Sequence, residues 1–192
     1  MKKGLLIILS GPSGVGKGTI RRYIMSHFDI DLSYSISMTT RSPREMEING
    51  VDYYFVSNEE FQRNIDTGNF LEWAEFVGNR YGTPKDKVDE LLNQGKNVLL
   101  EIEINGATQV FNKVQGQPNV ISFFLMPPSL SVLEGRIRRR KSESEEVIKE
   151  RLNKGKKEMK MHDNYDYVIL NDSVKRASEE IVFLINKKIA SY

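Results

Sequence analysis

The sequence has no cysteine, one tryptophan and only two histidines among its 192 residues. Without cysteine the chain can form neither disulfides nor thiolate metal sites. The histidines, His27 and His162, have no ligand partners at metal-binding spacing. A net charge of +2 is too small to predict nucleic-acid or membrane binding, and no apolar run approaches the roughly twenty residues of a membrane span. We therefore expect a globular, cytoplasmic protein that has neither nucleic acid nor a membrane as a partner.

One stretch, residues 4–19 (GLLIILSGPSGVGKGT), organises the rest of the chain. Its apolar run, residues 5–9, shows no alternation, which predicts a strand buried on both faces of a parallel sheet. Glycines and Lys17 follow, and then Ile20, Tyr23, Ile24 and Phe28 recur at helical spacing. A strand, a glycine-rich loop, a lysine and a helix in this order predict a phosphate-binding loop.

The glycines of this loop have a physical reason. Backbone N–H groups can surround a phosphate only where side chains do not block the approach, and some positions need a positive φ, which favours Gly11, Gly14 and Gly16. The helix N-terminus adds free N–H groups and its dipole, and Lys17 adds a full positive charge. The alternative is a glycine-rich turn that only joins a strand to a helix.

Four further segments predict strands of the same sheet: 32–37, 97–103, 120–126 and 167–170. Helical patterns lie between them, including one that opens with a capping-box pattern at Ser131 and Glu134, a polar helix over about 145–161 and an amphipathic C-terminal helix. Strands that alternate with helices predict an α/β fold with a mostly parallel sheet. Residues 39–83 are rich in Gly, Tyr and Phe and predict a small, mainly β insertion, and a second insertion begins near Arg136.

A second anion site is suggested within the first insertion. Arg41 and Arg44 lie three residues apart near hydroxyls and tyrosines, and their forked donors can surround a phosphate. The alternative is a solvated loop with exposed arginines. A phosphate site elsewhere in the chain favours the first interpretation.

Several motifs, in this order, resemble the guanylate kinase family. They are GPSGVGK at 11–17, SMTTRSPR at 37–44, Glu47 with GVDY at 50–53, YGT at 81–83, EIE at 101–103 with Gly106, PPS at 127–129 and VILND at 168–172. The resemblance covers essentially the whole chain. It implies a P-loop nucleoside triphosphate hydrolase-like core that transfers the γ-phosphate of ATP to GMP or dGMP with Mg²⁺.

The resemblance also implies a division of the chain and a set of site residues. The core would comprise residues 1–36, 85–134 and 158–192, the GMP-binding insertion 37–84 and the lid 135–157. The implied ATP-binding residues are Gly11, Pro12, Ser13, Gly14, Val15, Gly16, Lys17, Gly18 and Thr19. The GMP phosphate would be held by Arg41, Arg44, Tyr53 and Tyr81, and guanine would be read by Ser37, Glu72 and Thr83. Glu101 and Glu103 would lie near the acceptor and the metal waters, and the catalytic residues would be Lys17, Arg136, Arg140 and Arg151.

The chemistry of the residues agrees with these implied roles. Phosphoryl transfer needs alignment and positive charge around the equatorial oxygens, and Arg136 and Arg140 share one helix face. A carboxylate at Glu72 could accept hydrogen bonds from guanine N1–H and the exocyclic amine, a donor pair that adenine lacks. The arginines could instead form a solvated basic face or an RNA patch, although aromatic residues for base stacking are absent there.

Three departures from the family pattern matter. Gly18 replaces the hydroxyl residue that usually ligates Mg²⁺, so the metal is expected to be held by phosphates and waters near Thr19 and Glu103. Glu101 and Glu103 stand where Asp is common, and Arg139, Arg140 and Lys141 replace a more flexible lid sequence. The alternatives are a kinase for another nucleotide or a phosphorylated sugar, or a non-catalytic guanylate-kinase-like protein-binding domain. The sequence does not predict the oligomeric state.

Overall fold

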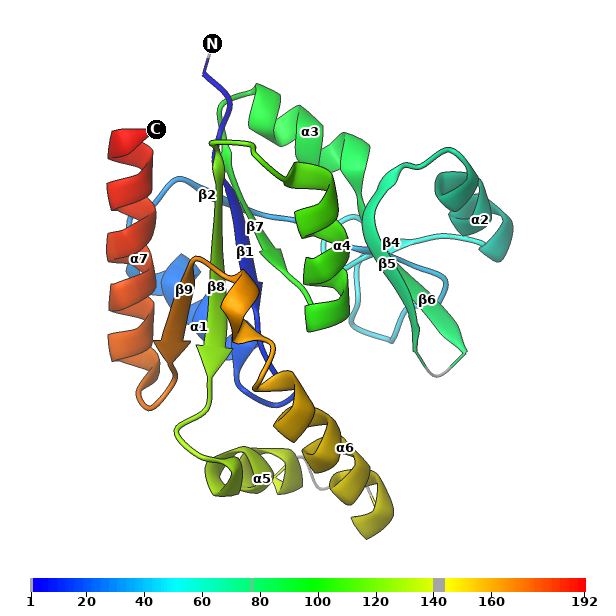
Figure 1. The fold of residues 1–192 in the computed structure, drawn as a ribbon. Coiled ribbons are helices and arrows are strands. Elements are labelled where there is room, and N and C mark those ends of the chain that lie inside the picture. Colours follow the sequence, from blue (N-terminus) through cyan, green and yellow to red (C-terminus); the bar gives the residue numbers. More distant parts are fainter. Residues whose placement is uncertain (1, 77, 140–143) are drawn as a thin grey trace.

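The computed structural model describes residues 2–76, 78–139 and 144–192 (Figure 1). Its main sheet has five parallel strands in the order β2-β7-β1-β8-β9. They are β1 (Leu6–Ser10), β2 (Leu32–Tyr34), β7 (Asn97–Glu101), β8 (Val120–Met126) and β9 (Tyr167–Leu170). All five predicted strands therefore belong to one sheet, and the predicted α/β fold class is confirmed.

Strand β1 is buried on both faces, as its unbroken apolar run predicts. Ile7 and Leu9 pack against one group of helices, while Leu6 and Ile8 pack against another. The first core includes residues of α1 (Lys17–His27) and α7 (Val174–Ser191), and the second includes residues of α3 (Lys85–Asn93) and α4 (Ile104–Val114). The sheet is thus a middle layer between two helical layers (Figure 1). None of the helices in the described ranges is both long and apolar enough to cross a membrane.

A second sheet lies at the side of the main one (Figure 1). Its strand order is β4-β3-β6-β5, with β3 (Met38–Thr39), β4 (Tyr54–Phe55), β5 (Phe70–Phe76) and β6 (Asn79–Pro84). Helix α2 (Asn58–Asp66) interrupts these strands and is capped by Ser57, whose hydroxyl accepts a hydrogen bond from the Glu60 N–H. The mainly β insertion predicted at residues 39–83 forms a sheet of its own.

Helices α5 (Leu130–Arg138) and α6 (Glu145–Glu158) lie below the carboxyl ends of the main strands (Figure 1). They share a small apolar cluster of Leu133, Ile137 and Ile148. The capping box predicted at Ser131 is wrong, because Ser129 is the N-cap and accepts the bond from the Val132 N–H. The short 3₁₀ helix His162–Asn164 leads from α6 to β9.

The two-sided core predicts where truncation destabilises the fold. Phe123 on β8 is fully buried, whereas Phe183 on α7 is 66% exposed. Phe123→Ala is expected to lower the free energy of unfolding by about 3–5 kcal/mol, because a large cavity replaces the ring. Phe183→Ala, the matched control, is expected to stay within about 0.5 kcal/mol of wild type. Urea unfolding followed by circular dichroism measures both, and equal effects would contradict this assignment of the core.

Candidate active site

The glycine loop sits between the central strand β1 and helix α1, at the carboxyl edge of the sheet. Gly11, Gly14 and Gly16 have φ values of 147°, 86° and 105°, so the predicted need for positive φ is confirmed. A Cβ on Gly11 would lie 2.6 Å from the Leu125 carbonyl oxygen. Helix α1 begins with no side-chain cap. The Thr19 N–H donates to the Gly16 carbonyl oxygen at 3.1 Å, and the start of a helix is a favourable place for an anion.

Lys17 folds back onto this loop. Its Nζ donates a hydrogen bond of 2.9 Å to the Gly11 carbonyl oxygen. Burial lowers the pKa of Lys17, and the negative charges of Glu103 and Glu101 oppose that change. The loop thus holds a poorly hydrated amino group, and a charge that is shielded from water interacts strongly with a phosphate. The acids nearby favour the charged form of Lys17.

Two predicted arginines reach the loop from the helices below it. The Arg136 guanidinium on α5 donates 2.8 Å from Nη1 to the Val15 carbonyl and 2.7 Å from Nη2 to the Asn171 carbonyl. On α6, Arg151 Nη2 donates to the Ser13 hydroxyl at 2.8 Å. Burial lowers the pKa of Arg136. Arg140, the other arginine predicted here, lies outside the described residues.

The loop has further partners that the motif order did not single out. Glu158 on α6 is buried, and its Oε2 accepts a 3.3 Å bond from the Ser13 N–H. The Asn171 side-chain amide donates 2.8 Å to the Val15 carbonyl, the same oxygen that Arg136 uses. Glu158 is the last residue of α6, and Asn171 follows β9 within the VILND motif. The structure shows that both contact the loop.

The two acidic residues at the end of β7 lie close to the loop. Arg21 on α1 donates to Glu101 Oε2 at 2.8 Å, and its guanidinium stacks over the Tyr34 ring at 4.1 Å from the centroid. A Cβ on Gly18 would lie 3.2 Å from Glu101 Oε1. The longer carboxylate of Glu101 therefore occupies space beside the position where a serine hydroxyl is usual. Glu103, the N-cap of α4, pairs with Lys154 at 3.4 Å on the surface.

The predicted second anion site forms a cluster on the smaller sheet. Arg41 donates to the Glu47 carboxylate from Nη1 at 2.9 Å and from Nη2 at 2.8 Å, and its guanidinium carbon lies 5.5 Å from the centroid of the Tyr53 ring. The rings of Tyr53 and Tyr81 meet edge to face at 6.1 Å. The Arg41 guanidinium and the Arg44 N–H lower the pKa of Glu47 to about 2. A carboxylate thus already engages the forked donors that suit a phosphate, while the Arg44 side chain is exposed.

Glu72 is the buried acid of the site. Its side chain on β5 is 8% exposed, and Oε1 accepts a 2.6 Å hydrogen bond from the Thr83 hydroxyl on β6, the strand paired with β5. Burial raises the pKa of Glu72, and the charge of Glu103 raises it further. Ser37 lies just before β3, where its carbonyl accepts a bond from the Tyr54 N–H. The negative charge of Glu103, the N-cap of α4, raises the pKa of Glu72 and opposes the lowering of the pKa of Lys17.

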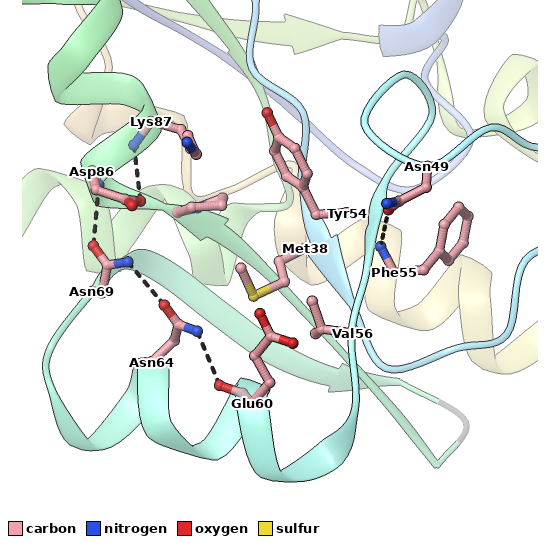
Figure 2. A pocket seen from close by; sticks show the side chains of 11 residues that line it. Met38, Asn49, Tyr54, Phe55, Val56, Glu60, Asn64, Asn69, Asp86 and Lys87 are labelled. Atoms are coloured by element: carbon pink, nitrogen blue, oxygen red, sulfur yellow. Dashed lines mark hydrogen bonds between the residues drawn. The ribbon is translucent and has the colours of Figure 1, made fainter.

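A cavity of about 420 Å³ in the second sheet region contains none of these residues. Figure 2 shows polar groups along its wall: the Asn64 amide donates to the Glu60 carbonyl, and the Asn69 amide donates to Asn64. Asn69 Oδ1 in turn accepts from the Asp86 N–H and so caps α3, which begins after a proline. The Asn64 and Asn69 side chains therefore bond to other residues of the wall, and these bonds connect α2 to the start of α3.

The geometry defines the class of protein. A glycine loop with an inward lysine, placed between the central strand of a parallel sheet and a helix N-terminus, is the site of a P-loop nucleoside triphosphate-binding fold. Arg136 on α5 and Arg151 on α6 contact this loop, and the second sheet region holds the Arg41–Glu47 pair and the buried Glu72.

Comparisons with known proteins place it further. The family model for guanylate kinase matches residues 3–188. The chain is 54% identical to the guanylate kinase of Mesoplasma florum over 187 residues, which are 97% of this chain and 62% of that protein. It is 52% identical to the guanylate kinase of Bacillus subtilis over 184 residues, 96% of this chain and 89% of that protein. A crystal structure of guanylate kinase from Anaplasma phagocytophilum matches with a TM-score of 0.74 and 31% identity, over 98% of this chain and 87% of that one.

The chain therefore belongs to the guanylate kinase family, and the resemblance inferred from its motifs is confirmed. It spans 62% of the length of the Mesoplasma florum relative and also 62% of a second guanylate kinase, from Mycoplasma capricolum.

The buried charge of Glu72 predicts a pH-dependent stability. Because its pKa is raised in the folded state, the folded protein binds this proton more tightly than the unfolded chain does. Stability is then greatest below the ordinary Glu pKa and is lost as pH rises through the raised value. Glu72→Gln keeps the acceptor for Thr83 and removes the charge, so its thermal midpoint is expected to exceed that of wild type at pH 7.5.

That advantage should shrink as the pH falls toward the ordinary pKa of Glu, because wild-type Glu72, whose pKa is raised, takes up its proton above that value. Scanning calorimetry at several pH values measures the difference between the two proteins. Glu75→Gln, an exposed change three residues along the same strand, is the control for net charge. Equal responses of the two variants would show that burial of Glu72 does not cause the effect.

Proposed function

We propose that this protein transfers the γ-phosphoryl group of ATP to GMP, and also to dGMP, giving ADP and GDP or dGDP. The observation that carries the proposal is a buried carboxylate, Glu72, bonded to Thr83, in a chain whose glycine loop also holds a lysine. Membership of the guanylate kinase family supports the same reaction.

The loop residues are proposed to bind ATP. Backbone N–H groups at the start of α1, which no side chain caps, and in the positive-φ glycine loop would provide donors for the β- and γ-phosphates. Lys17 now bonds the Gly11 carbonyl, and a phosphate oxygen would replace that neutral acceptor with a charged one. The exchange favours the phosphate, since hydrogen bonds between ions are about twice as strong as neutral ones.

The second cluster is proposed to bind GMP. Arg41, Arg44, Tyr53 and Tyr81 would hold its phosphate, and the GMP phosphate would share the guanidinium that Glu47 orients. Glu72 would accept hydrogen bonds from guanine N1–H and the exocyclic amine, with Ser37 and Thr83 at the remaining polar edge. An adenine at this position would leave a buried charge facing an acceptor, and sites built this way reject such analogues strongly.

Arg136 and Arg151 are proposed to stabilise the phosphoryl group during transfer. Both already contact the loop, through Val15 and Ser13, so their charges lie beside the bound phosphates. Phosphoryl transfer requires little covalent chemistry from a protein, and most of the rate enhancement comes from alignment and charge. A water-excluding arrangement of the two sites would also prevent hydrolysis of ATP.

Magnesium fits the residues that are present. The described ranges contain no cluster of three or more acidic or histidine side chains that could hold a metal ion alone, and Mg²⁺ in kinases is commonly held by phosphates, waters and one or two carboxylates. Glu101 and Glu103 would bind its waters, and Thr19 would lie near it in the absence of a hydroxyl at Gly18. When bound, the ion would neutralise charge on the phosphates.

The division into core, insertion and lid is also proposed here. The second sheet is built only from residues 38–84, which supports an insertion at 37–84. The separate cluster of Leu133, Ile137 and Ile148 supports a helical unit around 135–157 that moves with respect to the sheet. Such units would bring the arginines and the acceptor toward ATP on binding.

A direct assay tests the function. Purified protein is supplied with ATP, Mg²⁺ and, in separate reactions, GMP, dGMP, AMP, UMP or dTMP, and ADP formation is followed by a coupled assay. We expect GMP to have the highest kcat/KM, above AMP by roughly 10⁴-fold or more if Glu72 reads the base as proposed. Faster turnover of AMP, UMP or dTMP would point to the alternative kinase, and no turnover of any acceptor would point to the binding domain.

The role of Lys17 gives a second prediction. Lys17→Met removes the charge and keeps a similar chain length, so kcat is expected to fall by about 10²–10⁴-fold because stabilisation of the transition state is lost. The thermal midpoint should change little, since the single bond to Gly11 is a small part of the fold. Lys187→Met, an exposed change on α7, is the control. Activity of the Lys17 variant within a few-fold of wild type would contradict the assignment of the loop.

A further inference from the structure

We propose that helix α4 positions the base-reading carboxylate, with Gly106 and Gln109 as positioning residues for Glu72. The inference rests on the proposed function, because it assigns a cause to the placement of the residue that would select guanine. Neither residue is proposed to touch the nucleotide. Both act through strand β5, against which α4 packs.

Gly106 lies in the first turn of α4, close to Glu72. A Cβ built on Gly106 would lie 2.6 Å from Glu72 Oε2, 3.1 Å from its Cδ and 3.2 Å from its Cγ. The glycine does not have a positive φ, so backbone strain does not explain it. Glycine inside a helix is destabilising by roughly 0.5–1 kcal/mol relative to alanine. What the missing methyl provides is room for the carboxylate.

Gln109 holds the residue after Glu72 from the same helix face. Its Oε1 accepts a 3.2 Å bond from the Trp73 N–H, and its Nε2 donates a 3.0 Å bond to the Trp73 carbonyl. Strand β5 is an edge of the second sheet, so this backbone has no strand partner on its outer side. The Gln109 amide supplies the donor and acceptor that a neighbouring strand would supply. One turn further on, Lys113 donates to the Phe70 carbonyl.

Together these contacts fix the position of the Glu72 carboxylate. Thr83 holds Oε1 from the paired strand, the Gly106 backbone borders Oε2, and Gln109 fixes the strand itself. A methyl group at position 106 would require the carboxylate to move by several tenths of an ångström or more, since Cβ contacts below 3.0 Å do not occur. Displacements of about 1 Å in a binding constellation can cost about 100-fold in rate.

The main test is Gly106→Ala, with GMP and AMP kinetics measured on the same preparations. We expect KM for GMP to rise about 10–100-fold and the GMP/AMP ratio of kcat/KM to fall, while KM for ATP stays within twofold. Gly135→Ala is the matched control, because that glycine is also helical and a Cβ there meets nothing within 4 Å. Its GMP/AMP ratio should equal that of wild type.

Combining Gly106→Ala with Glu72→Asp separates positioning from a general loss of packing. Aspartate is one methylene shorter and withdraws the carboxylate from the added methyl, so the double variant is expected to bind GMP more tightly than the sum of the two single changes predicts. Gln109→Glu is the second variant, because it keeps the size and loses the N–H donor to the Trp73 carbonyl.

Trp73 is the only tryptophan of the chain, so its fluorescence reports on β5 without any assay of turnover. Titration with GMP alone should give a Kd at least 10-fold weaker for Gly106→Ala and for Gln109→Glu than for wild type. Unchanged Kd values and an unchanged GMP/AMP ratio in the folded variants would overturn the inference. If Gly106→Ala does not fold, the Gln109→Glu titration decides. Wild-type protein that fails to prefer GMP would instead refute the proposed function.

Discussion

The Val15 carbonyl oxygen joins the glycine loop to two other parts of the chain. It accepts hydrogen bonds from Arg136 on α5 and from the Asn171 amide after β9, and the Val15 side chain is fully buried. A loop rich in glycine has a high conformational entropy to lose on ordering. By bonding one oxygen from two directions, the chain ties that loop to its last strand and to a basic helix. The shape of the phosphate cradle depends on this arrangement.

Charge links the donor site to the acceptor site. The acids at the end of β7 lie near enough to Lys17 to oppose the lowering of its pKa by burial, and Glu103 also raises the pKa of Glu72. An acidic region between two anion sites would repel phosphates if it stood alone. A metal ion with its waters, together with Lys17 and the arginines, would balance that charge when nucleotides bind.

The proposed acceptor site would have a cost in stability. Glu72 is buried with one hydrogen-bond partner from Thr83, and an ionised group in that environment destabilises the folded protein. Gly106 adds a helix glycine at the same place. Core positions chosen for stability alone would avoid both. Their presence together is understandable if the carboxylate must stay charged, in one position, until a ligand with paired donors arrives.

Local sequence patterns are sufficient to predict strand β1, the glycine loop and the helix that follows it. An apolar run without alternation can only be buried on both faces, and glycines followed by Lys17 before a helix place the loop, because these properties depend on neighbours in sequence. The family motifs likewise indicate Glu72 and Arg41. Other contacts around the site could not be predicted, because they join distant segments. They are those of Glu158 and the Asn171 amide with the loop, Arg21 with Glu101, and Gln109 with β5. Hydrogen bonds between groups far apart in sequence produce no periodicity or spacing that can be recognised in the sequence. Only the packing of helices on the two sheets brings such groups together.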